Sequence, residues 1–286
     1  MKVFAKQLRR ALLTIFLGGL LGATLLRFSP GWGMDERELD PRLSTESRQA
    51  ARAEYDSEKN VFLYYTRYLR GALSGDLGIS RTFNRPVAEL MRERLPETAR
   101  SVGYGATAGL FAGMALAVAN GYGGWRLLDL IASALGGISL SIPAGLIAMA
   151  CFWARAPVFW AIGLAVFPYV YRYADGILRS AYAAGHVFAA RAGGQSELRI
   201  LTAQVLWPAS PQLVALVAVA ITVAFGAAVP IEVICDSPGI GQMAWKAAIA
   251  RDLPLLVGVT LLITVLTVTA TSLADLALAT RRGELQ

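Results

Sequence analysis

The chain has 286 residues, of which 55% are hydrophobic and 16% are charged, with a mean hydropathy of +0.49. Soluble domains carry about 25% charged residues, and the deficit here falls in long apolar runs, which is typical of membrane proteins. The net charge of +7 does not indicate nucleic-acid binding, because the basic residues stand at the ends of the apolar runs.

The side chains needed for most enzyme chemistry are missing. His186 is the single histidine, and the two cysteines, Cys151 and Cys235, have no metal-site or disulfide spacing. The chain also lacks a phosphate-binding loop, so any ATP site must be on another chain. We therefore expect no catalytic residues, no cofactor and no metal, and an unrelated membrane enzyme is disfavoured.

The first apolar run, residues 11–29, follows a basic segment at residues 1–10. The run is longer than a signal-peptide core of about 7–15 residues, and no cleavage site stands out. We expect an uncleaved transmembrane helix in residues 1–29. Its N-terminus should lie in the cytoplasm.

Residues 30–96 are charged and mixed in sign, and we expect an extracytoplasmic region of short helices there. Within it, residues 61–70 are rich in tyrosine and arginine, which suits a helix at the membrane surface. A small soluble cap is the alternative. The third part, residues 97–286, should form a core with five further transmembrane helices.

Those five helices are expected from the apolar runs of the remaining sequence. The run at 157–171 is short for a span of about 20 residues, but it can continue as a helix to Tyr182. The runs are residues 99–120, 128–153, 157–171, 213–231 and 255–279. The sequence thus predicts an all-α polytopic membrane protein with about six transmembrane helices.

Basic residues predict the orientation of these helices. Arginines occur in residues 121–127, 172–207 and 280–286, so these segments should face the cytoplasm together with residues 1–10. Residues 30–96 also carry many arginines, but a segment of that length does not control the orientation through its charge. Both termini are then cytoplasmic in a multi-pass protein of the cytoplasmic (inner) membrane.

The cytoplasmic segment at residues 183–207 is much longer than the usual helix connection of about 2–8 residues. Its first part is rich in alanine, Gly193 and Gly194 should end that helix, and a second helix should start near Ser196 as the N-cap. An ordinary connector is the alternative interpretation.

Four motifs, taken in chain order, give the chain a family resemblance. They are Ser29-Pro30-Gly31, the segment Ser74-Gly75-Asp76-Leu77-Gly78-Ile79-Ser80 followed by Pro86-Val87, Ala190-Arg191-Ala192 with Gly194, and Glu232 with Pro238-Gly239-Ile240-Gly241 and Arg251-Asp252-x-Pro254. With these motifs the chain resembles a B-type permease subunit of binding-protein-dependent ABC importers, in the dipeptide, oligopeptide and nickel branch. The resemblance covers nearly the whole chain and implies a type I importer permease fold.

The resemblance also implies partners. The segment at residues 183–207 would be the loop that docks on an ATP-hydrolysing subunit, through His186, Ala190, Arg191, Ala192 and Gly194. The expected partners are a second homologous permease chain, two cytoplasmic ATP-binding subunits, an extracytoplasmic solute-binding protein and the lipid bilayer, with no nucleic acid. Peptides or similar small solutes are the expected cargo.

The outer-face motifs are expected to be structural. Asp76 stands between Gly75 and Gly78, which suits a turn whose carboxylate accepts backbone N–H groups. Glu232 is expected to hydrogen-bond to the turn formed by Pro238, Gly239 and Gly241. Arg251, Asp252 and Pro254 complete the outer motif.

The chain departs from the family pattern in two places. Gly185, His186 and Gly193 stand where the coupling motif usually has an acidic residue, an aromatic residue and a lysine, and Pro208 and Pro211 are off register. Only residues 153–157 remain of the outer loop between helices three and four. These departures leave an alternative open, in which the chain is a degenerate homologue that serves as a structural subunit of another membrane complex.

Overall fold

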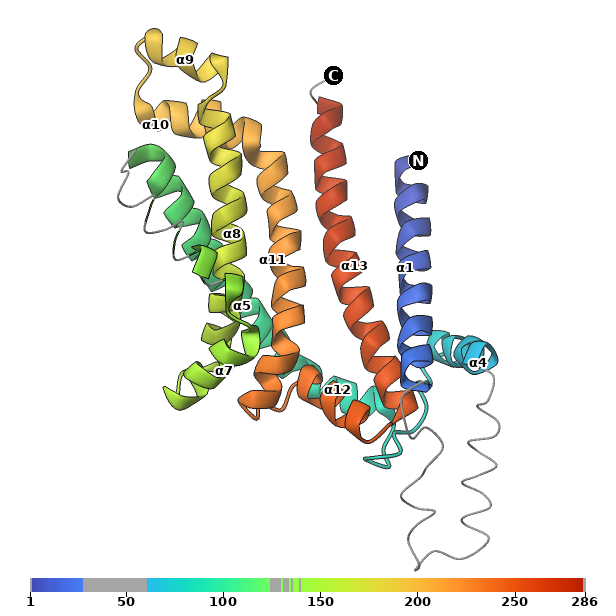
Figure 1. The fold of residues 1–286 in the computed structure, drawn as a ribbon. Coiled ribbons are helices and arrows are strands. Elements are labelled where there is room, and N and C mark those ends of the chain that lie inside the picture. The colour runs from blue at the N-terminus through green and yellow to red at the C-terminus, as the bar shows by residue number, and fades with distance from the viewer. Residues whose placement is uncertain are drawn as a thin grey trace, which may run out of the picture. The chain divides into compact units, whose positions relative to one another are not determined.

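The computed structural model describes residues 2–27, 61–123 and 140–284, with a few single positions between 130 and 138. In these ranges the regular elements are helices, and an isolated bridge pairs Ile79 with Pro86 (Figure 1). The chain forms two compact units, residues 1–95 with 243–266 and residues 96–242 with 267–286. The Ser29-Pro30-Gly31 motif lies outside the described residues.

The first unit is built from α1 (Lys2–Arg27), α4 (Val61–Leu73) and the first part of α13 (Leu253–Glu284). Its apolar core is formed by Tyr65, Tyr68, Leu253, Val257 and Leu261. Gly19 on α1 leaves room for the ring of Tyr65, whose hydroxyl lies 3.3 Å from the carbonyl oxygen of Ile15. This contact fixes the amphipathic α4 against α1.

The second unit is built around α5 (Val87–Gly123), α8 (Val158–Tyr182) and α11 (Trp207–Ile234), with the shorter α7 (Ala144–Trp153) packed beside them. Three glycines spaced four residues apart line the face of α5 against α8. A methyl group added to Gly105, Gly109 or Gly113 would lie 2.7–2.9 Å from atoms of α8. The two helices therefore pack with their backbones close together, as small residues allow in membranes.

Three described helices are long and apolar enough to cross a membrane. They lie within Val87–Tyr122, Glu197–Ile234 and Leu253–Leu273, and two shorter apolar helices cover Leu12–Gly22 and Ala144–Trp153. An all-α polytopic membrane protein is thus confirmed. The total of six spans and the three-part division at residues 29 and 96 stay predictions.

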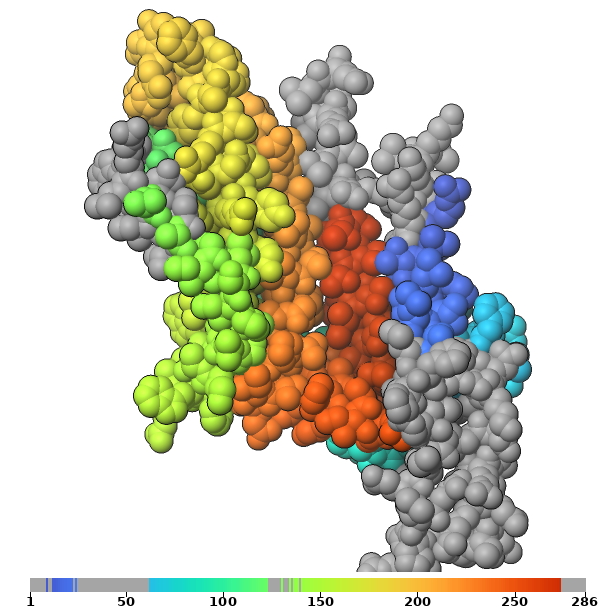
Figure 2. Space-filling model, viewed as in Figure 1, coloured from blue at the N-terminus to red at the C-terminus, as the bar shows by residue number. Residues whose placement is uncertain are grey.

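The segment between α8 and α11 folds as a short helix, a turn and a second helix. Helix α9 (Gly185–Ala192) ends at Gly193, and Gly194 has a φ of +76°, so the predicted glycine stop is correct. Helix α10 (Glu197–Arg199) follows and continues through the π-helical segment η1 (Ile200–Leu206) into α11. In Figure 2, α9 and α10 form a lobe (gold) at the end of α8. We call residues 185–199 the α9–α10 lobe.

Ser196 occupies the N-cap position of α10 as expected, although its side chain makes no capping hydrogen bond. The apolar run at residues 213–231 lies in a helix that starts earlier, at Trp207, with Pro208 and Pro211 in its first turns.

Candidate functional site

The outer signature at residues 74–80 forms a tight turn in the first unit. The Gly78 amide donates to Oδ1 of Asp76 at 2.9 Å, as the sequence predicted. Gly75 and Gly78 have φ values of +85° and +75°, a left-handed conformation that favours glycine. The two glycines thus shape the turn, and Asp76 fixes it.

Asp252 joins this signature to the last outer motif. Its side chain is fully buried, and it accepts hydrogen bonds from the Ser80 hydroxyl at 2.5 Å and the Thr82 amide at 2.9 Å. It also accepts from the Leu255 amide at 3.2 Å, in the first turn of α13. The sequence identified both motifs but gave no sign that they bind each other.

The residues beside Asp252 support the same junction. The Pro254 carbonyl accepts a hydrogen bond from the Tyr68 hydroxyl at 3.2 Å. Arg251 has a φ of +55° that turns the chain before α13. Burial raises the pKa of Tyr68, and the carboxylate of Asp252 raises it further. Tyr68 therefore stays protonated and remains a hydrogen-bond donor.

Glu232 organises the other outer motif, in the second unit. Its carboxylate is fully buried and accepts from the amides of Gly241 at 2.7 Å and Gln242 at 3.3 Å. Thr98 donates its hydroxyl proton to Glu232 at 2.7 Å and accepts the Ile240 amide at 2.7 Å. Together they cap the first turn of α12 (Ile240–Ile249), where free N–H groups and the helix dipole favour a carboxylate.

The glycines of this motif make room for the carboxylate. A methyl group on Gly239 would collide with the carboxylate of Glu232, and one on Gly241 would lie 2.7 Å from the backbone of Val229. The Ser237 amide donates to the Glu232 carbonyl at 2.9 Å, so Pro238 follows a closed turn. The expected hydrogen bond from Glu232 to this segment is present, whereas the part played by Thr98 was not foreseen.

In the α9–α10 lobe, two contacts brace α9. The guanidinium of Arg191 donates to both carboxylate oxygens of Glu197, at 2.8 and 3.0 Å, which raises the pKa of Arg191. The His186 Nε2 atom lies 2.9 Å from the Gln204 carbonyl oxygen. Pro208, four residues after Gln204, has no N–H to offer that carbonyl, so the histidine replaces the missing helical donor.

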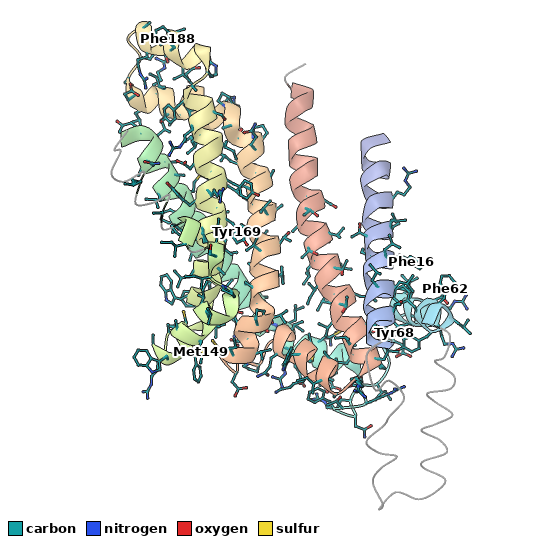
Figure 3. All side chains as sticks on the ribbon, in the orientation of Figure 1. Phe16, Phe62, Tyr68, Met149, Tyr169 and Phe188 are labelled. Atoms are coloured by element: carbon teal, nitrogen blue, oxygen red, sulfur yellow. The ribbon has the colours of Figure 1, made fainter. Side chains whose placement is uncertain are left out.

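Two large apolar side chains are exposed on the surface of the lobe, beside exposed polar and charged ones. Val187 is buried and anchors α9, whereas Phe188 is 77% exposed and Leu198 is 64% exposed. Figure 3 shows Phe188 on α9, at the end of the second unit that carries the lobe. Ala192 and Gly194 are exposed too, while Ala190 is half-buried. The arrangement presents a short, braced helix with an unpaired aromatic side chain.

A polar cluster lies near the same end of the second unit. Asp175 on α8 accepts from the Asn120 side-chain amide at 3.0 Å and from Arg179 at 2.7 Å.

In the part of the chain that the structure describes, no group of three histidine, cysteine or acidic side chains could hold a metal ion.

Comparison with known proteins decides the family. The model of the family described as binding-protein-dependent transport system inner membrane component matches residues 105–280. The chain belongs to this family. The matched residues include the α9–α10 lobe, Glu232 and Asp252, while the signature at residues 74–80 lies before them. The resemblance to ABC importer permeases is thereby confirmed, and the chain is a multi-pass inner-membrane transport protein.

Similar proteins in this permease family match the chain over most of its length. The oligopeptide transport system permease protein AppB of Bacillus subtilis is 26% identical, over 95% of this chain and 96% of AppB. The nickel import system permease protein NikB of Staphylococcus aureus is 23% identical, over 94% of this chain and 87% of NikB. A protein of Brucella suis biovar 1, provisionally named a peptide permease, is 26% identical over 93% of this chain.

Proposed function

We propose that the chain is a working permease subunit of an ABC importer, which carries peptides or similar small solutes inward with energy from ATP hydrolysis on partner subunits. The α9–α10 lobe carries this proposal. Phe188 on α9 and Leu198 on α10 are exposed, and the Arg191–Glu197 pair braces the two helices, which suits docking on an ATP-binding subunit. The other partners would be a second homologous permease chain and an extracytoplasmic solute-binding protein.

The brace supports a mechanical role for the lobe. Arg191 ties α9 to α10, and His186 ties α9 to the start of the long helix that contains Gln204. A displacement of α9 would therefore move α11 as well, because these contacts resist bending of the segment between the two helices. Transport by rocking of packed helices around a site needs a rigid connection of this kind.

The length of α11 supports the proposed orientation. Its 28 residues span about 42 Å at 1.5 Å per residue, more than the roughly 30 Å of a bilayer core. The lobe lies before the first residue of α11, and Glu232 lies near its last. A cytoplasmic lobe would thus put the Glu232 motif on the outer face, and we propose that both termini lie in the cytoplasm with the lobe.

Peptides are the proposed cargo because the relatives include an oligopeptide permease and a provisionally named peptide permease. NikB serves nickel import, but in the described residues no cluster of metal-binding side chains occurs. The second candidate function is a structural subunit without transport. Gly185 and Gly193, which stand at the acidic and lysine positions of the coupling motif, favour that alternative.

The deciding experiment is purification of the chain with the products of its neighbouring genes, followed by uptake assays in proteoliposomes. We expect an ATP-binding subunit in the complex and ATP-dependent peptide uptake. Gly194→Pro should abolish uptake, because proline cannot adopt the φ of +76° at this position. Gly185→Ala is the control, since a methyl group there meets no atom within 4 Å. A stable complex without a nucleotide-binding chain would overturn the importer and favour the structural subunit.

A further inference from the structure

The second unit contains a cavity of about 280 Å³ between α7, α8 and α11. Tyr169 reaches it from α8, and Figure 3 shows this residue on the stretch of α8 beside α11. Further lining residues are Ile142, Ile147, Ala165, Val223 and Gly226. The three helices that form the cavity pack against one another in the same unit, so its walls are well defined.

The residues that line the cavity favour an occupant that is apolar apart from one polar atom. The lining side chains are aliphatic or absent, apart from the phenol ring of Tyr169. Tyr169 is 38% exposed, and its hydroxyl has no hydrogen-bond partner among the described residues. The aliphatic walls favour a hydrocarbon group, and an amide beside that group would hydrogen-bond to the hydroxyl.

The size of the cavity fits part of a solute. Pockets that enclose whole drug-sized ligands measure about 300–1,000 Å³, so this one suits a single large side chain. Gly226 helps to keep the space open, because a methyl group added to it would meet no protein atom within 4 Å. A larger side chain at Gly226 can therefore enter the cavity without displacing the helices.

We propose that this cavity is a subsite for an apolar side chain of the transported solute, with the Tyr169 hydroxyl hydrogen-bonded to the adjacent amide or carbonyl group. This assignment rests on the proposed function and specifies the class of cargo. Solutes with leucine-like or aromatic side chains would use the subsite, and glycine-only peptides would leave it empty. A lipid chain is the competing occupant, but it would leave the hydroxyl unpaired.

The test uses the purified importer complex with its own binding protein, in proteoliposomes, and compares uptake of glycyl-leucine with that of glycyl-glycine. Gly226→Leu should fill the subsite and lower uptake of glycyl-leucine about tenfold, with little change for glycyl-glycine. Tyr169→Phe should raise the KM for glycyl-leucine about fivefold, the usual effect of one hydrogen bond. Each variant is normalised to the wild-type complex, which cancels the preference of the binding protein.

Gly176→Leu is the matched control. Gly176 lies on α8, and like Gly226 on α11 it has no atom within 4 Å of an added methyl group, but it does not line the cavity. Equal loss of both peptides in Gly226→Leu, or no loss of either, would overturn the assignment. So would a tightly held lipid, detected by mass spectrometry of the complex, that Gly226→Leu expels without altering uptake. If the wild-type complex shows no ATP-dependent uptake, the proposed function fails first and the subsite fails with it.

Discussion

Thr98 and Glu232 are 134 positions apart in the sequence, yet the Thr98 hydroxyl donates to the Glu232 carboxylate at 2.7 Å. Both side chains are buried, with 3% and 0% of their surface exposed. The pair holds α5 and α11 together where the first turn of α12 begins. The Pro-Gly motif that follows α11 is therefore one part of a buried polar junction, which Thr98 and Glu232 complete.

Removal of the Glu232 carboxylate should destabilise this junction. Glu232→Ala leaves the Gly241 and Gln242 amides buried without an acceptor, which costs about 1–3 kcal/mol per unsatisfied group. Thermal unfolding of the protein in lipid nanodiscs would measure the effect. Glu97→Gln is the control, because the Glu97 side chain receives no hydrogen bond in the described part of the chain. Equal stability of the two variants would contradict the capping role.

Asp252 and Ser80 offer a second test of buried polar contacts. Ser80→Ala removes the 2.5 Å hydrogen bond to a buried carboxylate and should lower stability by about 1.5–3 kcal/mol. Ser74→Ala, in the same loop, removes an exposed hydrogen bond to Gly71 and should change stability much less. Urea unfolding monitored by tryptophan fluorescence compares the two variants. A larger loss from Ser74→Ala would show that Asp252 does not join these motifs.

Two glycines of α5 differ in how closely other atoms approach them, so their substitution by alanine should have different effects on stability. Gly105→Ala places a methyl group 2.7 Å from Ile162 and should destabilise the protein by about 1–3 kcal/mol through overpacking. Gly103→Ala meets no atom within 4 Å and should be neutral or slightly stabilising, since alanine favours helix. The melting temperatures of the two variants, measured side by side, should differ in this direction. Identical values would exclude the close packing of α5 on α8.

The contact between His186 and Gln204 can be tested by loss and rescue. His186→Phe keeps an aromatic ring but removes the donor, so we expect about threefold less uptake per ATP hydrolysed, in keeping with one exposed hydrogen bond. Pro208→Ala restores a backbone N–H near the Gln204 carbonyl and should return the double variant close to the wild-type ratio. The readout is the ratio of uptake to hydrolysis in proteoliposomes. A double variant as impaired as His186→Phe would contradict the replacement of a missing donor by His186.

The sequence predicted features that depend on local chemistry. Neighbouring residues are enough to predict the hydrogen bond from the Gly78 amide to Asp76 and the helix stop at Gly193 and Gly194. The same holds for the extension of the fourth helix to Tyr182. Pro208 and Pro211 were noted only as off register with the family motif, and their place in the first turns of α11 was not predicted.

Contacts between distant residues could not be predicted in this way. Thr98 is an ordinary residue in a long run, and nothing beside it indicates a partner at Glu232. The bond from Ser80 to Asp252 joins positions 172 apart, and the motif containing each residue makes sense without the other. The four-residue spacing of Gly105, Gly109 and Gly113 is a sequence feature that could have indicated close helix packing.

The close approach of α5 and α8 restricts how the protein can move. Gly105, Gly109 and Gly113 each face a particular turn of α8, so sliding one helix along the other would bring side chains against backbone. Rotation of either helix about its own axis meets the same obstacle. The pair must therefore travel as one body during any transport cycle, and the moving joints have to be sought at its ends, where the backbone turns.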